Sequence, residues 1–245
     1  MSKTYVIGDI HGGLKAVEQV LAKASVQPED TLVFLGDYVD GWSESPQVID
    51  FLIQLGERQK CIFIRGNHDE LVLDWMDNGN KNIDEGMWFK HGGEATVKAY
   101  STVSIEKKQA HIAFLKSLQD YYIDAENRLF IHAGFTNSHG VAYEYFPELF
   151  YWDRTLWETA LALDPRMEKD SVFYPKRLTL YSEIYIGHTP TTRINQTTPV
   201  NKACVWNVDT GAAFKGPLTI LNVETKAFFQ SDLLPVLYPN EIGRN

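Results

Sequence analysis

The first part of the chain alternates short apolar runs with amphipathic segments. Apolar side chains recur at helical spacing at Leu14, Val17, Leu21 and Ala24, which predicts a helix. Ser45-Pro46 has the form of an N-cap followed by proline at the first helical position, and it predicts the start of a second helix. Intervening apolar runs predict strands at residues 4–7, 31–35 and 61–64. This strand and helix series is typical of a mainly parallel sheet covered by helices.

The pattern changes in the middle of the chain. From about residue 71 to 126 it predicts helical pieces without strands, including a helix from Ile105 to Leu118 with Ser104 as its cap. We expect this excursion to be a helical insert over one edge of the sheet. A further helix is expected at residues 153–163, and strands at 129–131, 183–186, 203–208 and 218–223. The last two strands lie close in sequence, which favours an antiparallel second sheet.

Composition and charge exclude several classes of function. The 245 residues include 23 Lys and Arg against 32 Asp and Glu, a net charge of −9 that argues against binding a nucleic-acid polymer. The composition is that of a globular protein, and one domain spanning residues 1–245 is expected. No apolar run approaches a membrane span or a signal-peptide core. Cys61 and Cys204 are expected to be free thiols, with a disulfide between them as the alternative, and a cytoplasmic location without a membrane partner follows.

Polar residues cluster where the predicted strands end. In an open α/β sheet, the carboxyl ends of the strands form the edge at which ligands bind. Imidazole and carboxylate groups together suit divalent ions such as Mn, Fe or Zn, and one carboxylate can bridge two ions. Any one of these residues alone is more simply a turn or core residue. Four of the seven histidines, however, fall at glycine-flanked strand ends: His11, His68, His132 and His188.

Five short motifs carry a family resemblance. In chain order they read Gly8-Asp9-Ile10-His11-Gly12, Gly36-Asp37-Tyr38-Val39-Asp40, Gly66-Asn67-His68-Asp69, His132-Ala133-Gly134 and Gly187-His188-Thr189. The series resembles the calcineurin-like metallophosphoesterase superfamily, and within it the bacterial phosphoprotein-phosphatase-like branch, which includes symmetrical diadenosine tetraphosphatases. The resemblance covers residues 4 to about 223. It implies an α/β fold, a four-layer αββα sandwich of two mixed sheets flanked by helices, in which residues 71–126 form a cap-like insert over the site.

The resemblance also implies roles for individual residues. Two divalent metal ions are expected, with Mn favoured and Fe or Zn as alternatives. The implied ligands are Asp9, His11 and Asp37 for the first ion, and Asp37, Asn67, His132 and His188 for the second. Asp37 would bridge, and the two ions would direct a shared water at phosphorus without a covalent enzyme intermediate. His68 would be the general acid, Asp40 would orient it, and Asn67 would also lie beside the substrate.

One departure from the family pattern concerns phosphate binding. The branch has an arginine after the position of Asp40 that holds the substrate phosphate, whereas this chain reads Gly41-Trp42. A second family arginine corresponds to Arg154, whose alternative reading is a surface arginine at a helix start. Trp42 is a weaker candidate for stacking on a substrate. His91 in the insert and His139 are weaker candidates for contacts near the site, with packing or surface positions as the alternatives.

The function predicted from these residues is that of a metal-dependent hydrolase. The expected substrates are phosphomonoesters, as for a serine/threonine protein phosphatase, on a phosphorylated protein, peptide or small molecule. The alternative is a nucleotide anhydride hydrolase resembling diadenosine tetraphosphatase, and a second alternative is a metal-binding scaffold without catalysis. Because two divalent cations would outweigh the site's aspartates, the bound metals would reverse the local charge. Anionic substrates should therefore bind only when metal is present.

Overall fold

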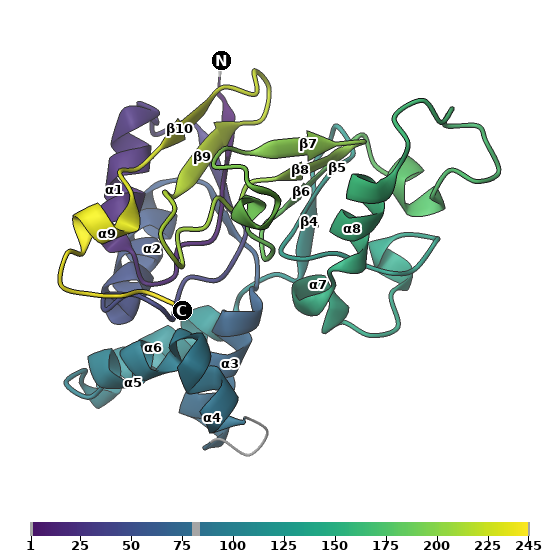
Figure 1. The fold of residues 1–245 in the computed structure, drawn as a ribbon. Coiled ribbons are helices and arrows are strands. Elements are labelled where there is room, and N and C mark those ends of the chain that lie inside the picture. Colours follow the sequence, from purple (N-terminus) through teal and green to yellow (C-terminus); the bar gives the residue numbers. More distant parts are fainter. Residues whose placement is uncertain (1, 80–83, 245) are drawn as a thin grey trace.

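The structure, a computed structural model, describes residues 2–79 and 84–244. Two five-stranded sheets face each other, and helices cover their outer faces (Figure 1). This arrangement confirms the predicted four layers. Cys61 and Cys204 are both free thiols, as expected. Within the part of the chain that the structure describes, no helix is long and apolar enough to span a membrane.

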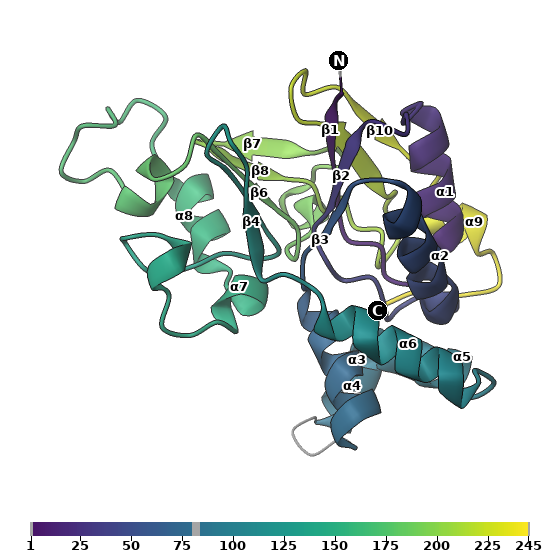
Figure 2. The same cartoon turned by 180° about the vertical axis from the view of Figure 1, so that it is seen from behind.

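The first sheet has the strand order β10-β9-β1-β2-β3. Its parallel strands are β1 (Thr4–Ile7), β2 (Thr31–Phe34) and β3 (Cys61–Phe63). Its antiparallel strands are β9 (Thr219–Asn222) and β10 (Phe228–Gln230). The outer face of this sheet is covered by α1 (Leu14–Lys23), α2 (Ser45–Arg58) and α9 (Leu234–Leu237), which Figure 2 shows from behind.

The second sheet has the strand order β4-β5-β6-β8-β7. Its parallel strands are β5 (Arg128–Ile131), β6 (Glu183–Ile186) and β8 (Val205–Asn207). Its antiparallel edges are β4 (Tyr121–Ile123) and β7 (Val200–Lys202). The helices on its outer side are α7 (Leu149–Trp152) and α8 (Thr155–Ala162), and short 3-10 turns occupy Val141–Tyr143, Lys176–Thr179 and Thr191–Ile194.

Three apolar cores fill the three spaces between the four layers. Two of them lie between a sheet and its helices. The third lies between the sheets, where Val6 and Leu221 of the first sheet meet Phe130 and Tyr185 of the second. The rings of Phe130 and Tyr185 stack with centroids 5.0 Å apart. Strands buried on both faces explain why the sequence shows short continuous apolar runs rather than alternation.

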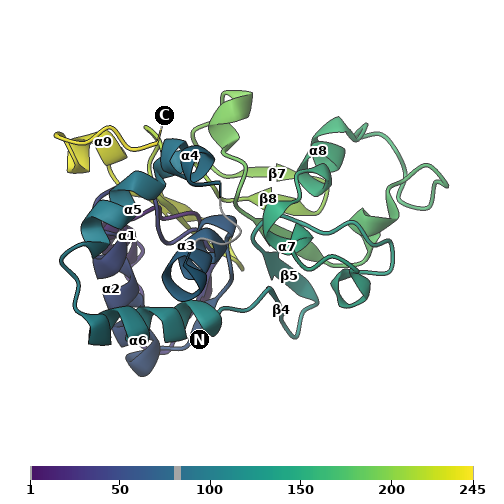
Figure 3. The same cartoon turned by 90° about the horizontal axis from the view of Figure 1, so that it is seen from below.

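The helical insert lies at one end of the first sheet and its helices, and Figure 3 shows it in front of α1 and α2. It comprises α3 (Asn67–Asn78), α4 (Glu85–Trp88), the π-helical segment Phe89–Gly93, α5 (Glu94–Tyr100) and α6 (Ile105–Lys116). Ser104 caps α6 by accepting a hydrogen bond from the backbone N–H of Lys107, as predicted. Asp50 of α2 binds Lys107 at 2.7 Å and His111 at 3.0 Å, which fastens the insert to the first sheet's helices.

Two expectations about strands are wrong. β4 lies inside residues 71–126, where no strand was expected. It is an edge strand of three residues whose side chains are all partly or fully exposed, so the sequence shows no alternation of buried and exposed positions there. β8 and β9 do not pair with each other: β8 pairs with β6 and β7, and β9 pairs with β1 and β10. All four residues of β9 are buried. A short buried run of this kind predicts a strand, but it does not indicate which of the two sheets the strand joins.

Candidate active site

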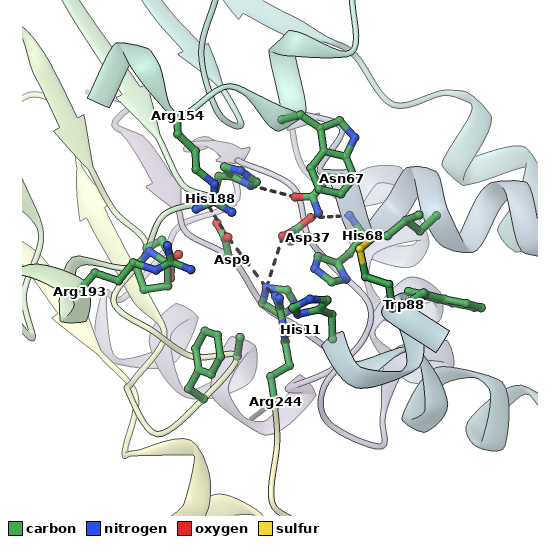
Figure 4. Close-up of a pocket in the computed structure, with 18 residues that line it drawn as sticks. Asp9, His11, Asp37, Asn67, His68, Trp88, Arg154, His188, Arg193 and Arg244 are labelled. Carbon is green, nitrogen blue, oxygen red and sulfur yellow. Dashed lines mark hydrogen bonds and ion pairs between the residues drawn. The ribbon is translucent and has the colours of Figure 1, made fainter. Parts of the chain in front are cut away.

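The predicted site residues meet where the strands of both sheets end beneath the insert (Figure 4). Asp9 and His11 follow β1, Asp37 follows β2, and His188 follows β6. Asn67 and His68 begin α3. A pocket at this edge is lined by most of the predicted residues, namely Asp9, His11, Asp37, Asn67, His68, Arg154 and His188. Asp40 and His132 are fully buried behind them.

Four of the site residues have left-handed backbone conformations. The φ angles are 53° for His11, 54° for Asp37, 69° for Asp40 and 64° for His188. Such conformations cost roughly 1–3 kcal/mol each for residues other than glycine, and they persist only where neighbouring contacts enforce them. His11 is held in this way, because its backbone N–H donates to the carbonyl oxygen of Asp37 at 2.8 Å. The strained turns let side chains from separate loops converge on one pocket.

Asp37 lies at the centre of the site. Its Oδ2 is 3.4 Å from Nε2 of His11 and 3.5 Å from Nε2 of His132. Its Oδ1 accepts a hydrogen bond from the backbone N–H of His68 at 2.9 Å. Burial acts to raise the pKa of Asp37, but the surrounding imidazoles outweigh it and hold that pKa well below the usual value. One ionised oxygen therefore faces two imidazoles, which is the geometry that a bridging carboxylate requires.

Asp69 holds the loop that presents Asp37, a role the sequence did not reveal. Its two oxygens accept hydrogen bonds of 2.8 Å from the backbone N–H groups of Asp37 and Tyr38. A third hydrogen bond of 2.8 Å comes from the backbone of Gly66. A Cβ at Gly66 would overlap the carboxylate of Asp37, so only glycine allows this close approach.

The side-chain oxygen of Asn67 faces ring nitrogens of His132 and His188. Oδ1 of Asn67 lies 3.2 Å from Nε2 of His132 and 2.9 Å from Nδ1 of His188. Nδ1 of His132 lies 2.8 Å from the carbonyl oxygen of Leu35 and must donate to it, so the neutral ring presents a lone pair at Nε2. Burial lowers the pKa of His132 and keeps its ring neutral. Two lone pairs 3.2 Å apart indicate that a cation belongs between them.

The second set of ligand atoms surrounds His11. Nδ1 of His11 lies 3.1 Å from the carbonyl oxygen of Val39, which leaves Nε2 as the lone-pair nitrogen facing Asp37. Oδ2 of Asp9 is 4.0 Å from this nitrogen, and the buried Oδ1 of Asp9 has no hydrogen-bond partner among the described residues. Burial, and then Asp209, raise the pKa of Asp9 well above its usual value. A carboxylate in this position gains from a neighbouring cation.

These residues fit a pair of divalent cations. Two groups of three residues have ligand atoms within 4.8 Å of one another, namely His11, Asp37 and His68, and Asp37, His132 and His188. Asp37 belongs to both groups, as the predicted bridging position does. His68 stands in place of Asp9 in the first group, and the assignment of individual residues as metal ligands stays a prediction.

His68 and Asp40 form a buried pair beside the ligand groups. Nδ1 of His68 lies 2.7 Å from Oδ2 of Asp40, and the two side chains are 3% and 0% exposed. The indole Nε1 of Trp88 donates to the same oxygen at 2.7 Å. The backbone N–H of Asp40 donates to the hydroxyl oxygens of both Ser45, at 3.1 Å, and Thr96, at 3.0 Å. Ser45 therefore braces the Asp40 loop from inside α2 and makes no side-chain cap, contrary to expectation.

Three arginines line the pocket, of which the sequence indicated one. Arg154 lies just before α8, and its guanidinium donates to the hydroxyl of Thr189 at 3.3 Å. It faces the pocket rather than the open surface. Arg193 and Arg244 were missed, because Arg193 belongs to a polar loop and Arg244 lies beyond the region of resemblance.

The weaker candidates fall in different places. The Trp42 ring is fully buried, donates from Nε1 to the carbonyl oxygen of Ala212 at 2.7 Å and stacks on Tyr238. It therefore cannot stack on a substrate, contrary to that expectation. His91 is exposed and lines the pocket from the insert. His139 lies on an exposed loop against Tyr143 and is not among the residues that line the pocket.

The fold and the two ligand groups agree with a metal-dependent phosphoester hydrolase, the class that the family match assigns to this chain. The model of the calcineurin-like phosphoesterase family matches residues 2–205, and the chain belongs to this family. The family uses a binuclear metal centre, which agrees with the ligand groups found here.

Named relatives cover nearly the whole chain. The asymmetrical bis(5'-nucleosyl)-tetraphosphatase PrpE of Oceanobacillus iheyensis is 28% identical over 92% of this chain and 90% of its own length. Serine/threonine-protein phosphatase 1 of Salmonella typhimurium is 24% identical over 90% of this chain and 91% of its own length. A crystal structure described as a putative diadenosine tetraphosphatase shares the fold, with a TM-score of 0.63, 20% identity and coverage of 94% of this chain and 92% of that chain. These relatives agree with the predicted phosphoprotein-phosphatase-like branch.

Proposed function

We propose that this protein hydrolyses phosphate monoesters by direct attack of water, with His68 as the general acid. The observation that carries the proposal is the buried pair of His68 and Asp40, joined at 2.7 Å, directly beside two groups of metal-ligand atoms. A carboxylate on Nδ1 fixes the ring so that Nε2 can carry a proton to the leaving oxygen, and it stabilises the imidazolium that delivers this proton. A scaffold that bound metal without catalysis would gain nothing from this pair.

The residues that would hold two divalent cations are Asp9, His11, Asp37, Asn67, His132 and His188. Bound there, the cations would supply Lewis acidity and a water made nucleophilic at neutral pH. We propose Mn as the physiological metal, with Fe or Zn as alternatives, because mixed imidazole and carboxylate ligands accept all three. Arg154 would bind the phosphoryl oxygens through its two terminal nitrogens, with Asn67 beside them.

For the substrate we propose phosphoserine or phosphothreonine in a protein or peptide, as the name of the Salmonella relative suggests. A nucleotide anhydride is the second candidate, because PrpE proteins are named as tetraphosphatases and three arginines line a single pocket. A chain of linked phosphates could contact all three, whereas a monoester presents a single phosphate. We further propose a cytoplasmic location, since both cysteines are free.

The decisive experiment compares kcat/KM for phosphopeptides, dinucleoside polyphosphates, mononucleotides and an aryl phosphate, using protein loaded with Mn, Fe or Zn. We expect turnover that a chelator abolishes and added metal restores. His132→Gln should lose activity, whereas His139→Gln, a matched change outside the pocket, should keep it. Absence of turnover on every ester and anhydride with every metal would overturn the proposal in favour of a binding scaffold. A preference for polyphosphates of more than about tenfold in kcat/KM, or 1.4 kcal/mol, would select the second candidate.

A further inference from the structure

The segment that follows α9 returns to the pocket and is fastened there at three points. The carboxylate of Glu241 accepts hydrogen bonds from the backbone N–H and the hydroxyl of Ser43, at 2.9 and 2.7 Å. Gly243, with φ +70°, lies so close to the Trp42 ring that an added Cβ would come within 2.6 Å of it. The backbone N–H of Arg244 donates to the carbonyl oxygen of Ala213 at 2.8 Å. These contacts direct the Arg244 side chain into the site (Figure 4).

Gly41 and Trp42 form the surface on which this segment docks. Trp42 supplies a flat ring held between Gly243 and Tyr238, whose ring centroid is 5.3 Å away. Gly41 has φ +103°, and a Cβ there would lie 3.4 Å from Cγ of Arg244. The space beside Gly41 is thus filled by the stem of Arg244. The two residues that depart from the family pattern are the same two that accommodate the returning segment.

Among the described residues, the guanidinium of Arg244 forms no ion pair with a carboxylate. Its Nη1 lies 3.4 Å from Nε2 of His11, and its Cζ lies 5.2 Å from the ring centroid of Phe214. Its Nε is buried without a hydrogen-bond partner, and no carboxylate of the described residues lies within 4.0 Å of it. A partly buried cation without a counter-ion is costly. An oxyanion in the pocket would supply both the charge and the acceptor.

The other two arginines strengthen this conclusion. Burial lowers the pKa of Arg154, and the charges of Arg193 and then Arg244 lower it further. The arginines therefore repel one another across the pocket, and a dianionic phosphoryl group between them would relieve that repulsion. Planar guanidinium groups bind such oxygens through two donors each.

We propose that Arg244 binds the phosphoryl group of the substrate, from the space that a side chain at position 41 would otherwise take. The inference rests on the proposed function, since it assigns a second phosphate-binding arginine to the same site. It also supplies a phosphate-binding arginine to a site in which no arginine follows Asp40.

The test uses Arg244→Gln and Arg244→Lys in the whole metal-loaded protein, with Arg166→Gln as the matched control, because Arg166 is 87% exposed and pairs only with Asp164 among the described residues. Two quantities are measured: kcat/KM on an aryl phosphate and the inhibition or dissociation constant of inorganic phosphate. We expect Arg244→Gln to lower kcat/KM and to weaken phosphate binding, each by tenfold or more. Arg244→Lys keeps the positive charge but lacks the two-donor guanidinium group, so its kcat/KM and phosphate affinity should lie between those of Arg244→Gln and the wild type. Arg166→Gln should match the wild type in both. Ethylguanidinium should restore part of the activity of Arg244→Ala, which a merely structural role would not allow.

Phosphate affinity and kcat/KM within twofold of wild type in Arg244→Gln would overturn the inference. A wild type that binds phosphate but turns over no ester would defeat the proposed function, while phosphate binding would still report on Arg244.

Gly41→Arg would not be a useful test of the missing arginine, because the backbone φ of +103° at this position strains any side chain and the new Cβ would contact the Arg244 stem. A variant that frees the segment is more informative: Glu241→Gln should raise KM more than it lowers kcat, since it loosens the anchor on Ser43.

Discussion

The indole of Trp88 donates a hydrogen bond of 2.7 Å to Oδ2 of Asp40, the same oxygen that lies 2.7 Å from Nδ1 of His68. Trp88 is 1% exposed and belongs to α4, so the insert contributes directly to the orientation of the proposed general acid. The insert is therefore part of the proposed catalytic arrangement as well as one wall of the pocket. Trp88 acts through Asp40, which makes it a positioning residue.

Trp88→Phe should lower kcat by about tenfold or more with little change in KM. A hydrogen bond to a charged group contributes about 1.5–3 kcal/mol, and Asp40 keeps its contact with His68 when the indole N–H is lost. The loss should be greater for substrates with poor leaving groups, because they depend most on the acid. Steady-state kinetics on a series of aryl phosphates checks this.

Trp206→Phe is the control, because Trp206 packs against the core between the sheets and is not among the residues that line the pocket. Trp206→Phe should lose no more stability than Trp88→Phe does, and it should keep the wild-type kcat. An equal loss of kcat in both variants would show that the Trp88 effect is general destabilisation. A loss confined to KM would instead place the indole against the substrate.

Metal binding should stabilise the fold through Asp37. Since the cations would bind the folded state, stability should rise with Mn concentration, by about 2.7 kcal/mol at a hundred times the dissociation constant. Asp37→Asn removes the negative charge and puts an amide N–H₂ in place of one carboxylate oxygen between His11 and His132, so it should abolish most of this Mn-dependent rise in Tm. Thermal unfolding with and without Mn measures it.

Asp164→Asn is the matched control for Asp37→Asn, because Asp164 lies on the surface beside Arg166. It should keep the full response to Mn. If Asp37→Asn responded to Mn as the wild type does, the bridging role of Asp37 would be refuted even if activity were lost.

The attachment of the insert to α2 should depend on pH through Asp50. Burial acts to raise the pKa of Asp50, but hydrogen bonds from Lys107 and His111 outweigh it and hold the pKa below its usual value. A lowered folded pKa means that the stabilisation is complete above the unfolded pKa of about 3.9 and is lost as the pH falls through the folded value. Asp50→Asn should therefore lower stability at pH 7 by up to about 1 kcal/mol, with the difference narrowing toward pH 3.5.

Urea unfolding at several pH values measures the difference between Asp50→Asn and wild type. Asp170→Asn serves as the comparison, because Asp170 is exposed and no ion pair involving it occurs among the described residues. A difference that stayed constant from pH 7 to about pH 3.5 would contradict the ionic origin of the effect.

The metal-ligand positions that the sequence predicted share one property: each follows a strand. Asp37 and His188 could be placed because an apolar run ends directly before their glycine-flanked positions, and parallel strands bring their carboxyl ends to one edge. The fold class followed from the same regularity. The edge strand β4 and the partners of β9 could not be predicted, because burial and hydrogen-bonding partners are decided by tertiary packing.

The parts that the sequence did not predict depend on contacts between distant segments. Arg244 approaches His11 across 233 positions of the chain, and no local spacing signals that contact. Trp88 lies in the predicted insert beside His91, and nothing in its local sequence indicates the hydrogen bond that it donates to Asp40. Trp42 appeared available for stacking because it follows the position of the missing arginine, whereas its ring packs closely against Gly243. In each case the deciding partner comes from a loop or from the end of the described chain.

The role of His68 as general acid predicts a specific dependence on the leaving group. A proton supplied to the leaving oxygen matters little when that oxygen is already a good leaving group, and it contributes about 10²–10⁴-fold when it is poor. His68→Asn should therefore lower kcat by that factor for alkyl phosphates and hardly at all for the most acidic phenols, so its rate falls more steeply with leaving-group pKa than that of the wild type. His91→Asn removes an imidazole from the same pocket wall without touching Asp40, and it should keep the wild-type slope. Parallel slopes for His68→Asn and wild type would remove His68 from proton transfer and leave it, with His11 and Asp37, as a residue of the metal site.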